Sequence, residues 1–405
     1  MNRKIDLKGL IPSGNELRIL LNSKHISEGE INFTLKGKGI FCGSGDKIFS
    51  VPLLSATLLT SNEYENIIDK SIARNLKPKN KMSKLELTDN DANWQESLKN
   101  LLTPDFNPFL DIPNIEPTKK PILTVIEKNK IKIRYEIKRK DFSKDFINRE
   151  LDFYGEIFIE KQDADLKLES IYTHTSKETE LINRRIGVAI AKKLKDSGIT
   201  KSDVEDGITF DSFQDIERVR FFKRLTGGLE TELRLDNVDE IVISREASIT
   251  PLPDDPKVSW MNDTVKYMTI DGDRLHNIFL MADEKYYQYY FINNMALTYK
   301  YAVNINLGSV KVCFYFSSSS RKKNTFDNKS ELIFEIDAIK YENETTISSR
   351  NKIKEEISEK IRFMIKNEYE KILNERKNNS AIAIRESSDS EIKDQQYTKD
   401  LFGED

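Results

Sequence analysis

Carboxylates followed by a lysine are the residues of this chain that could carry out hydrolytic chemistry. A magnesium-dependent nuclease of the restriction type needs an Asp on one strand and an Asp/Glu-x-Lys triplet on the next, which places two carboxylates around Mg²⁺ beside a lysine. With 67 acidic residues among 405, about seven such triplets are expected by chance. Two sets have the required order, namely Asp105 with Glu136 and Lys138, and Asp152 with Asp165 and Lys167. Because Asp105 lies in a proline-rich stretch, the nuclease hypothesis uses the second set, within residues 121–200.

Other chemistry is not indicated by the residues that usually carry it. The chain has neither the Gly-x-x-x-x-Gly-Lys-Ser/Thr phosphate loop nor the glycine spacing of a dinucleotide fold. His25, His174 and His276 are isolated, so they predict neither a zinc site nor a serine triad. Cys42 and Cys313 lie far apart and follow no metal or redox spacing. We therefore expect no resident metal and no cofactor, except Mg²⁺ if the nuclease hypothesis holds.

Two clusters of basic side chains could contact phosphates. Residues 119–144 hold 10 Lys/Arg and 3 Asp/Glu, a net charge of +7, although the whole chain has a formal charge of −3. Within this segment apolar residues alternate with basic ones, which predicts a half-buried strand with a basic outer face. A helix further along adds a second cluster. The alternatives are that the lysines protect a sheet edge and that the helix belongs to the core. The candidate residues are Lys130, Lys132, Arg134, Lys138, Arg220, Lys223 and Arg224.

Short capped helices are expected in the first 80 residues. Ser27 precedes Glu30, and Thr60 precedes Glu63, at the spacing of a capping box. Each pair is followed by apolar residues at helical intervals.

Strands and longer helices are expected in the body of the chain. Alternation predicts strands at 131–137, 153–159 and 166–171, and a capped helix follows from Ser176. Another helix is expected from 214 to 225. Residues 229–341 alternate apolar runs with turns at 271–273 and 307–309, which is typical of an antiparallel meander with strands at 286–292, 299–305, 310–316 and 332–336. A long helix over 350–377 carries an apolar stripe that ends near Ile372.

Residues 26–55 resemble SAP domains, which are small helix-extended-helix modules that bind nucleic acid. The matching positions are Ser27, Glu30-Ile31, Leu35, Lys38-Gly39-Ile40, Ser44-Gly45-Asp46-Lys47, Val51 and Leu54. Asp46 is an acid where the family often has a base, and Pro52 falls within the second helix. The resemblance implies a phosphate-contacting site made of Lys38, Ser44, Gly45 and Lys47. The alternative is a small helical docking domain.

The sequence as a whole predicts an α+β protein: a helical N-terminal domain (1–80), a proline-containing linker (81–120), an α+β subdomain (121–228), a meander with a long helix (229–378) and a disordered acidic tail (379–405). No apolar run of membrane-spanning length occurs and the start lacks a signal peptide, so we expect a cytoplasmic protein without a membrane partner.

The function favoured by these observations is that of a non-catalytic subunit that binds nucleic acid, DNA rather than RNA, together with a protein partner or a second copy. By analogy, such a chain resembles accessory components of bacterial anti-phage or mobile-element systems. Two alternatives remain, a magnesium-dependent nuclease in 121–200 and a structural subunit that oligomerises through the meander and the final helix.

Overall fold

The fold is α+β, as predicted, and its internal contacts divide the chain into two compact units. Unit 1 comprises Met1–Lys79 with Lys84–Glu205, and unit 2 comprises Asn80–Ser83 with Asp206–Asp405. The boundary thus lies at 205/206 and not at the expected 228/229. The computed structural model describes residues 11–23, 26–44, 46–67, 77–89, 93–99, 101–102, 106–140, 150–162, 166–214, 216–245, 255, 259, 267–273, 275, 279–303, 306–317, 328–343 and 346–401.

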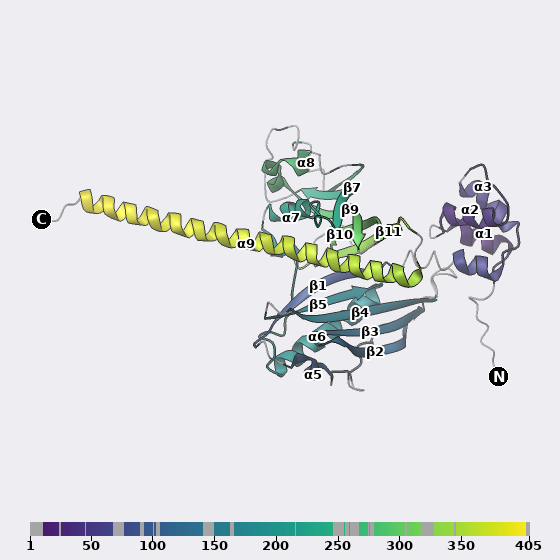
Figure 1. Cartoon of the computed structure of the whole chain (residues 1–405), viewed down its shortest axis with the longest axis horizontal. Helices are drawn as coiled ribbons and strands as arrows, with labels where there is room; N and C mark the ends of the chain where they lie inside the picture. Colours follow the sequence, from purple (N-terminus) through teal and green to yellow (C-terminus); the bar gives the residue numbers. More distant parts are fainter. Residues whose placement is uncertain are drawn as a thin grey trace. The chain divides into compact units, whose positions relative to one another are not determined.

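The N-terminal part of unit 1 is a small helical domain, as expected (Figure 1). It contains α1 (Gly14–Asn22), α2 (Glu28–Gly37), α3 (Lys47–Ser55) and a further helix whose described part covers 61–67. Each helix contributes one apolar face to a common core. The core residues are Leu17, Leu20, Leu21, Ile26, Ile31, Leu35, Val51, Leu54, Tyr64 and Ile67.

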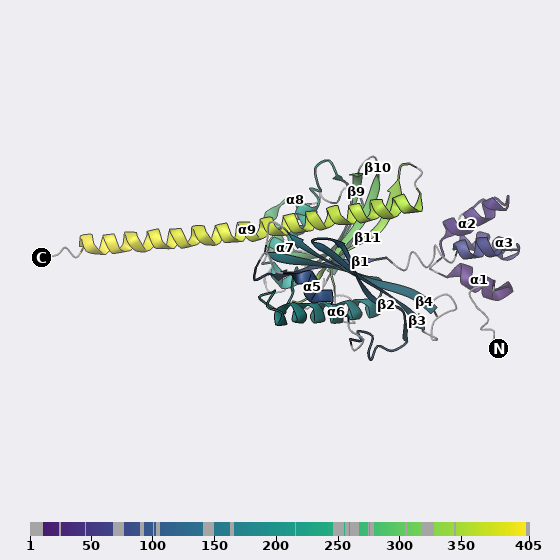
Figure 2. The same cartoon turned by 60° about the horizontal axis from the view of Figure 1, so that its bottom comes forward.

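The remainder of unit 1 is an antiparallel sheet with helices on one face. Its strands run in the order β2 (Ile115–Glu127), β3 (Lys130–Lys140), β4 (Glu150–Gln162) and β5 (Lys167–His174). In Figure 2, α6 (Lys177–Asp196) lies along one face of these strands, and the short α5 (Trp94–Lys99) contacts α6. Ile131, Ile133 and Ile137 on β3 point into the core with Ile182 and Ile186 of α6. The opposite face of β3 is therefore the polar one.

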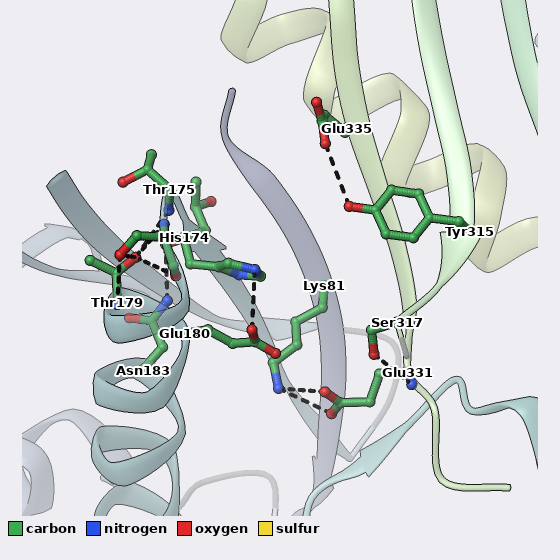
Figure 3. Close-up of polar contacts among 12 residues, drawn as sticks. Lys81, His174, Thr175, Thr179, Glu180, Asn183, Tyr315, Ser317, Glu331 and Glu335 are labelled. Carbon is green, nitrogen blue, oxygen red and sulfur yellow. Dashed lines mark hydrogen bonds and ion pairs between the residues drawn. The ribbon is translucent and has the colours of Figure 1, made fainter. Parts of the chain in front are cut away.

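Hydrogen bonds at the N-terminal end of α6 hold the helix on this sheet. The Tyr135 hydroxyl lies 2.7 Å from the Thr179 carbonyl oxygen and 2.9 Å from Asn183 Oδ1. Asn183 Nδ2 donates to the Thr173 carbonyl, and Thr179 Oγ1 accepts from the Thr175 backbone (Figure 3). Buried polar groups at the helix start are thus satisfied by the strands beneath.

Unit 2 is built on antiparallel strands that are covered by two helices. The strand order is β11 (Leu332–Tyr341), β10 (Asn306–Phe316), β9 (Tyr290–Val303), β7 (Leu233–Arg245) and β8 (Tyr267–Asp271). The core between the sheet, α7 (Glu217–Leu225) and α9 (Ile347–Leu401) is rich in aromatic residues. Unit 2 also contains the two-residue β6 (Asp206–Gly207), η2 (Phe210–Ser212), α8 (Phe279–Ala282) and η4 (Glu284–Tyr289).

Polar contacts at one end of the unit 2 sheet join the segments near β11. Lys81 Nζ donates to both carboxylate oxygens of Glu331, at 3.0 and 2.8 Å, and the Glu331 amide donates to Ser317 Oγ (Figure 3). Residues 80–83 are thereby attached to this sheet.

Further sequence expectations differ from the structure. The segment expected to be a linker, 81–120, contains most of β1 (Lys79–Glu86), all of α5 and the start of β2. The start of β2 can include prolines because β2 is an edge strand. The strand expected at 286–292 begins only at Tyr290, since η4 buries the adjacent Tyr286 and Tyr287 together. The turn expected at 307–309 lies inside β10, where Gly308 makes room for the Tyr301 ring.

The C-terminal segment continues α9 as far as Leu401. Side chains beyond residue 378 lie outside the described residues, so the disordered acidic tail stays a prediction. The apolar stripe of α9 faces the unit 2 core, and its members are Ile353, Ile357, Ile361, Met364, Ile365 and Ile372. The apolar surface that the oligomerisation hypothesis requires on this helix is therefore covered within unit 2.

Candidate binding surfaces

The helix-extended-helix segment forms because its caps are encoded locally. Ser27 and Glu30 make the predicted capping box: the Ser27 amide donates to Glu30 Oε2 at 2.9 Å, and the Glu30 amide donates to Ser27 Oγ at 3.3 Å. Gly39 has a φ of +74°, which ends α2 and lets the Ile40 amide donate to the Leu35 carbonyl. Residues 40–44, between α2 and α3, belong to no helix or strand.

The predicted phosphate site at the start of α3 is filled by the chain itself. Asp46 is the N-cap residue, and its carboxylate accepts from the Ile48 amide at 2.9 Å. Ser44 Oγ accepts from the Asp46 amide. A helix N-terminus attracts anions through free amides, and here a carboxylate already occupies that position. Gly45 lies outside the described residues.

The two lysines of this site make contacts within the domain. Lys47 Nζ donates to the Ser23 carbonyl at 2.7 Å, and Lys38 Nζ donates to the Leu58 carbonyl at 2.6 Å and to Glu63 Oε2 at 2.8 Å. The hydrogen bond from Lys38 holds the pKa of the Glu63 carboxyl below its usual value. Both ammonium groups would have to leave these partners to reach a phosphate.

The basic face of β3 is matched by an acidic face of β4. Directly opposite residues in an antiparallel pair share a face, and on the outer face the two strands carry five basic and five acidic side chains. Lys132 Nζ lies 2.8 Å from Glu156 Oε1, and Arg134 lies 3.6 Å from the same carboxylate. The ladder has no net charge, so the positive potential predicted from β3 alone is cancelled. The opposed pairs are Lys130 with Glu160, Arg134 with Glu156, Lys138 with Asp152 and Lys140 with Glu150.

The cations of α7 are also engaged within their own unit. Arg224 donates to Glu375 of α9 at 2.6 Å, and Arg220 donates to Glu284 at 2.7 Å. Lys223 Nζ lies 5.7 Å from the centre of the Tyr287 ring. Between these cations, Val219, Phe221, Phe222 and Leu225 are fully buried. The alternative that this helix belongs to the core is thus the better description of its apolar side.

Asp152 and Lys167 of the nuclease hypothesis are not brought together. Lys167 pairs with Gln162 on β4, and Asp152 is ten residues earlier on that strand, which corresponds to about 33 Å at ~3.3 Å per residue. Asp165 and Asp105 lie outside the described residues, and Glu136 and Lys138 are on the outer face of β3. Within the described part of the chain, no group of three or more His, Cys, Asp or Glu side chains could hold a metal ion.

The outward face of α3 is a surface that the sequence reasoning missed. Ser50, Val51 and Leu54 face the domain core, whereas Ile48, Phe49, Pro52 and Leu53 point away from it. The exposed fractions of Ile48, Phe49 and Leu53 are 72%, 57% and 40%. A helix that is apolar on both sides is normally covered on both sides. The sequence signal was the apolar run on either side of Ser50, of which the SAP resemblance uses only Val51 and Leu54.

Comparison with known proteins identifies the N-terminal part alone. Residues 15–77 match the family described as the GAPS4b protein N-terminal domain, which agrees with the helical domain of unit 1. No match was found among curated proteins or among solved structures. Among the described helices, none is both long and apolar enough to span a membrane. The N-terminal helical domain is therefore similar to the GAPS4b N-terminal domain, and its resemblance to SAP domains stays a prediction.

Proposed function

We propose that this chain is a non-catalytic accessory component of a bacterial anti-phage defence system, and that its N-terminal domain binds a protein partner through α3. The GAPS4b name of the matching family hints at a defence component. The binding role rests on the outward face of α3, where Ile48, Phe49, Pro52 and Leu53 lie next to one another and form an exposed apolar surface.

An amphipathic helix of a partner protein is the occupant that fits this face. Ile48 with Pro52, and Phe49 with Leu53, form two parallel ridges at i,i+4 spacing, the arrangement through which helices pack on helices. Covering the exposed parts of Ile48, Phe49 and Leu53 would release roughly 3–5 kcal/mol of transfer free energy. That amount is enough for these residues to dominate an interface.

The test combines a protection assay with a binding assay. The chain is expressed in bacteria with the genes encoded beside it, and phage plaquing is compared between wild type and the double variant Ile48→Ser, Phe49→Ser. We expect the variant to keep its circular dichroism spectrum, because both side chains are outside the core, and to lose protection by at least tenfold.

The control is Leu58→Ser, which removes an apolar side chain that is 92% exposed but lies outside α3. It should protect like wild type. Co-purification of a neighbouring gene product with the wild type and the control, but not with the double variant, identifies the partner. Full protection by a folded double variant would refute the proposed role of α3.

A second candidate function is nucleic-acid association by the same domain. It is favoured by the succession of the two short helices α2 and α3, which the SAP resemblance implied. The variant Lys38→Glu, Lys47→Glu should then weaken binding to duplex DNA and reduce its salt dependence. The control Arg18→Glu, Lys36→Glu reverses two exposed charges outside the predicted site. Equal affinities for the two double variants across a salt titration would exclude the site.

A further inference from the structure

The edge strand β2 has two halves with opposite properties. Residues 115–121 contain Pro117, Pro121, Lys119 and Lys120, and their pairing with β3 is irregular. Prolines, lysines and bulges are the devices that keep an edge strand from pairing with another chain. Residues 122–125 have none of them and pair with β3 in regular register, and the register shifts again between Val125 and Glu127.

The second half of β2 is apolar and open on its free side. β2 is the terminal strand of its sheet, so it has a single described neighbour strand, β3. The exposed fractions of Ile122, Val125 and Ile126 are 61%, 45% and 45%. An exposed edge of β-branched residues without charge or proline is a template for adding a further strand.

The segment is symmetric about Thr124. It reads Ile122-Leu123-Thr124-Val125-Ile126, so an antiparallel copy centred on Thr124 places Ile122 opposite Ile126 and Leu123 opposite Val125. The pair of Leu123 with Val125 joins apolar side chains on the same face, which is the favourable cross-strand arrangement. In the outer pair, Ile126 lies where the register of β2 with β3 shifts. A two-fold interface requires this kind of self-complementary surface.

The same register also limits the length of the pairing. Next to the apolar pairs, Pro121 would lie opposite Glu127, where proline offers no amide for the ladder. One step further, Lys120 would lie opposite Lys128, and two like charges face each other. The contact therefore covers a short central segment and stops at both ends by symmetry.

We propose that β2 pairs in antiparallel orientation with β2 of a second copy of this chain, with the two-fold axis at Thr124. The two sheets then continue through the interface on both sides of the axis. This surface is independent of α3, so the two proposals fail separately. A contact this short has the size of a reversible interface, and the dimer should dissociate on dilution.

The experiment uses Thr124, which would lie opposite Thr124 of the second copy. Thr124 is exposed, so charged substitutions leave the core of unit 1 intact. The full-length variants Thr124→Lys and Thr124→Glu each place like charges on the axis, and sedimentation velocity should show at least a tenfold weaker dimer for each. An equimolar mixture of the two variants places opposite charges on the axis and should restore the dimer.

The control is Thr118→Lys, a change at another exposed position on the same strand, outside the symmetric segment. It should dimerise like wild type. The proposal is overturned by a wild-type protein that stays monomeric at high micromolar concentration, by undiminished dimers in either single variant, or by a mixture that fails to recover them.

Discussion

Gly155 on β4 is the position where a single methyl group should disturb unit 1 most. It lies directly opposite Tyr135 on β3, and a Cβ added there would be 2.2 Å from the Tyr135 hydroxyl oxygen and 2.3 Å from Cζ. Neither distance is compatible with van der Waals contact. The Tyr135 side chain is fully buried, and moving its ring away from Gly155 would disturb the hydrogen bonds of its hydroxyl with Thr179 and Asn183.

The substitution Gly155→Ala should therefore cost about 3 kcal/mol. Overpacking a core typically costs ~1–3 kcal/mol, and displacing the hydroxyl from its buried acceptors adds about 1 kcal/mol. Urea unfolding measures this cost through Trp94, which is buried in the same core. In a Trp260→Phe background Trp94 is the single tryptophan, and the unfolding midpoint should fall by roughly 1–2 M urea.

Two comparisons decide whether the clash is the cause. Gly43→Ala adds a methyl group with no atom within 4 Å and should change stability by less than about 0.5 kcal/mol. In a Tyr135→Val background the ring is absent, so the added cost of Gly155→Ala should fall below about 1 kcal/mol. A Gly155→Ala protein as stable as wild type, or an equal cost in both backgrounds, would refute the reasoning.

Three further outcomes are expected. The pKa of Glu63 is lowered mainly by the hydrogen bond from Lys38. This contact therefore stabilises the helical domain fully at pH values above the ordinary pKa of 4.5, and the stabilisation is lost as the pH falls through the lower folded-state pKa. In an acid titration followed by circular dichroism, the Glu63→Gln variant should lose less stability than the wild type. Burial raises the pKa of Cys313 to about 12, so at pH 8 iodoacetamide should modify Cys42 first, as peptide mass spectrometry can show. Phe222→Ala should lower the free energy of unfolding of unit 2 by about 3–5 kcal/mol in urea, because Phe222 of α7 is fully buried. If α7 served only to contact phosphates, the same substitution would change this free energy little.

The features predicted correctly from the sequence are those decided by near neighbours along the chain. The capping boxes at Ser27 and Thr60 form as expected, because both partners of each box are three residues apart. The alternation of β3 and the apolar stripe of α9 identify the buried sides of these elements, because side-chain direction follows from the period of the backbone. Fold class follows from such periods.

The tertiary structure decided which partners the outward-facing charged side chains have. The sequence of β3 alone predicted a basic surface, but the register of β3 with β4 places acidic residues of β4 opposite its lysines. Lys38 similarly forms a hydrogen bond with Glu63, which lies 25 residues later in the sequence. The same register holds Asp152 and Lys167 at distant ends of one strand pair, although they are close in the sequence.

The exposure of the apolar residues on the outer face of α3 was likewise decided by the tertiary structure. Its side chains are chemically indistinguishable in the sequence from those that fill the core, and only the packing of α1 and α2 determines which of the two faces is buried. Local rules specify the periodicity of a segment, but charge balance, register and exposure depend on segments far away in the chain. The sequence by itself therefore determined the helix caps and the periodicity of single segments, and the tertiary structure determined which of their faces are buried and which are exposed.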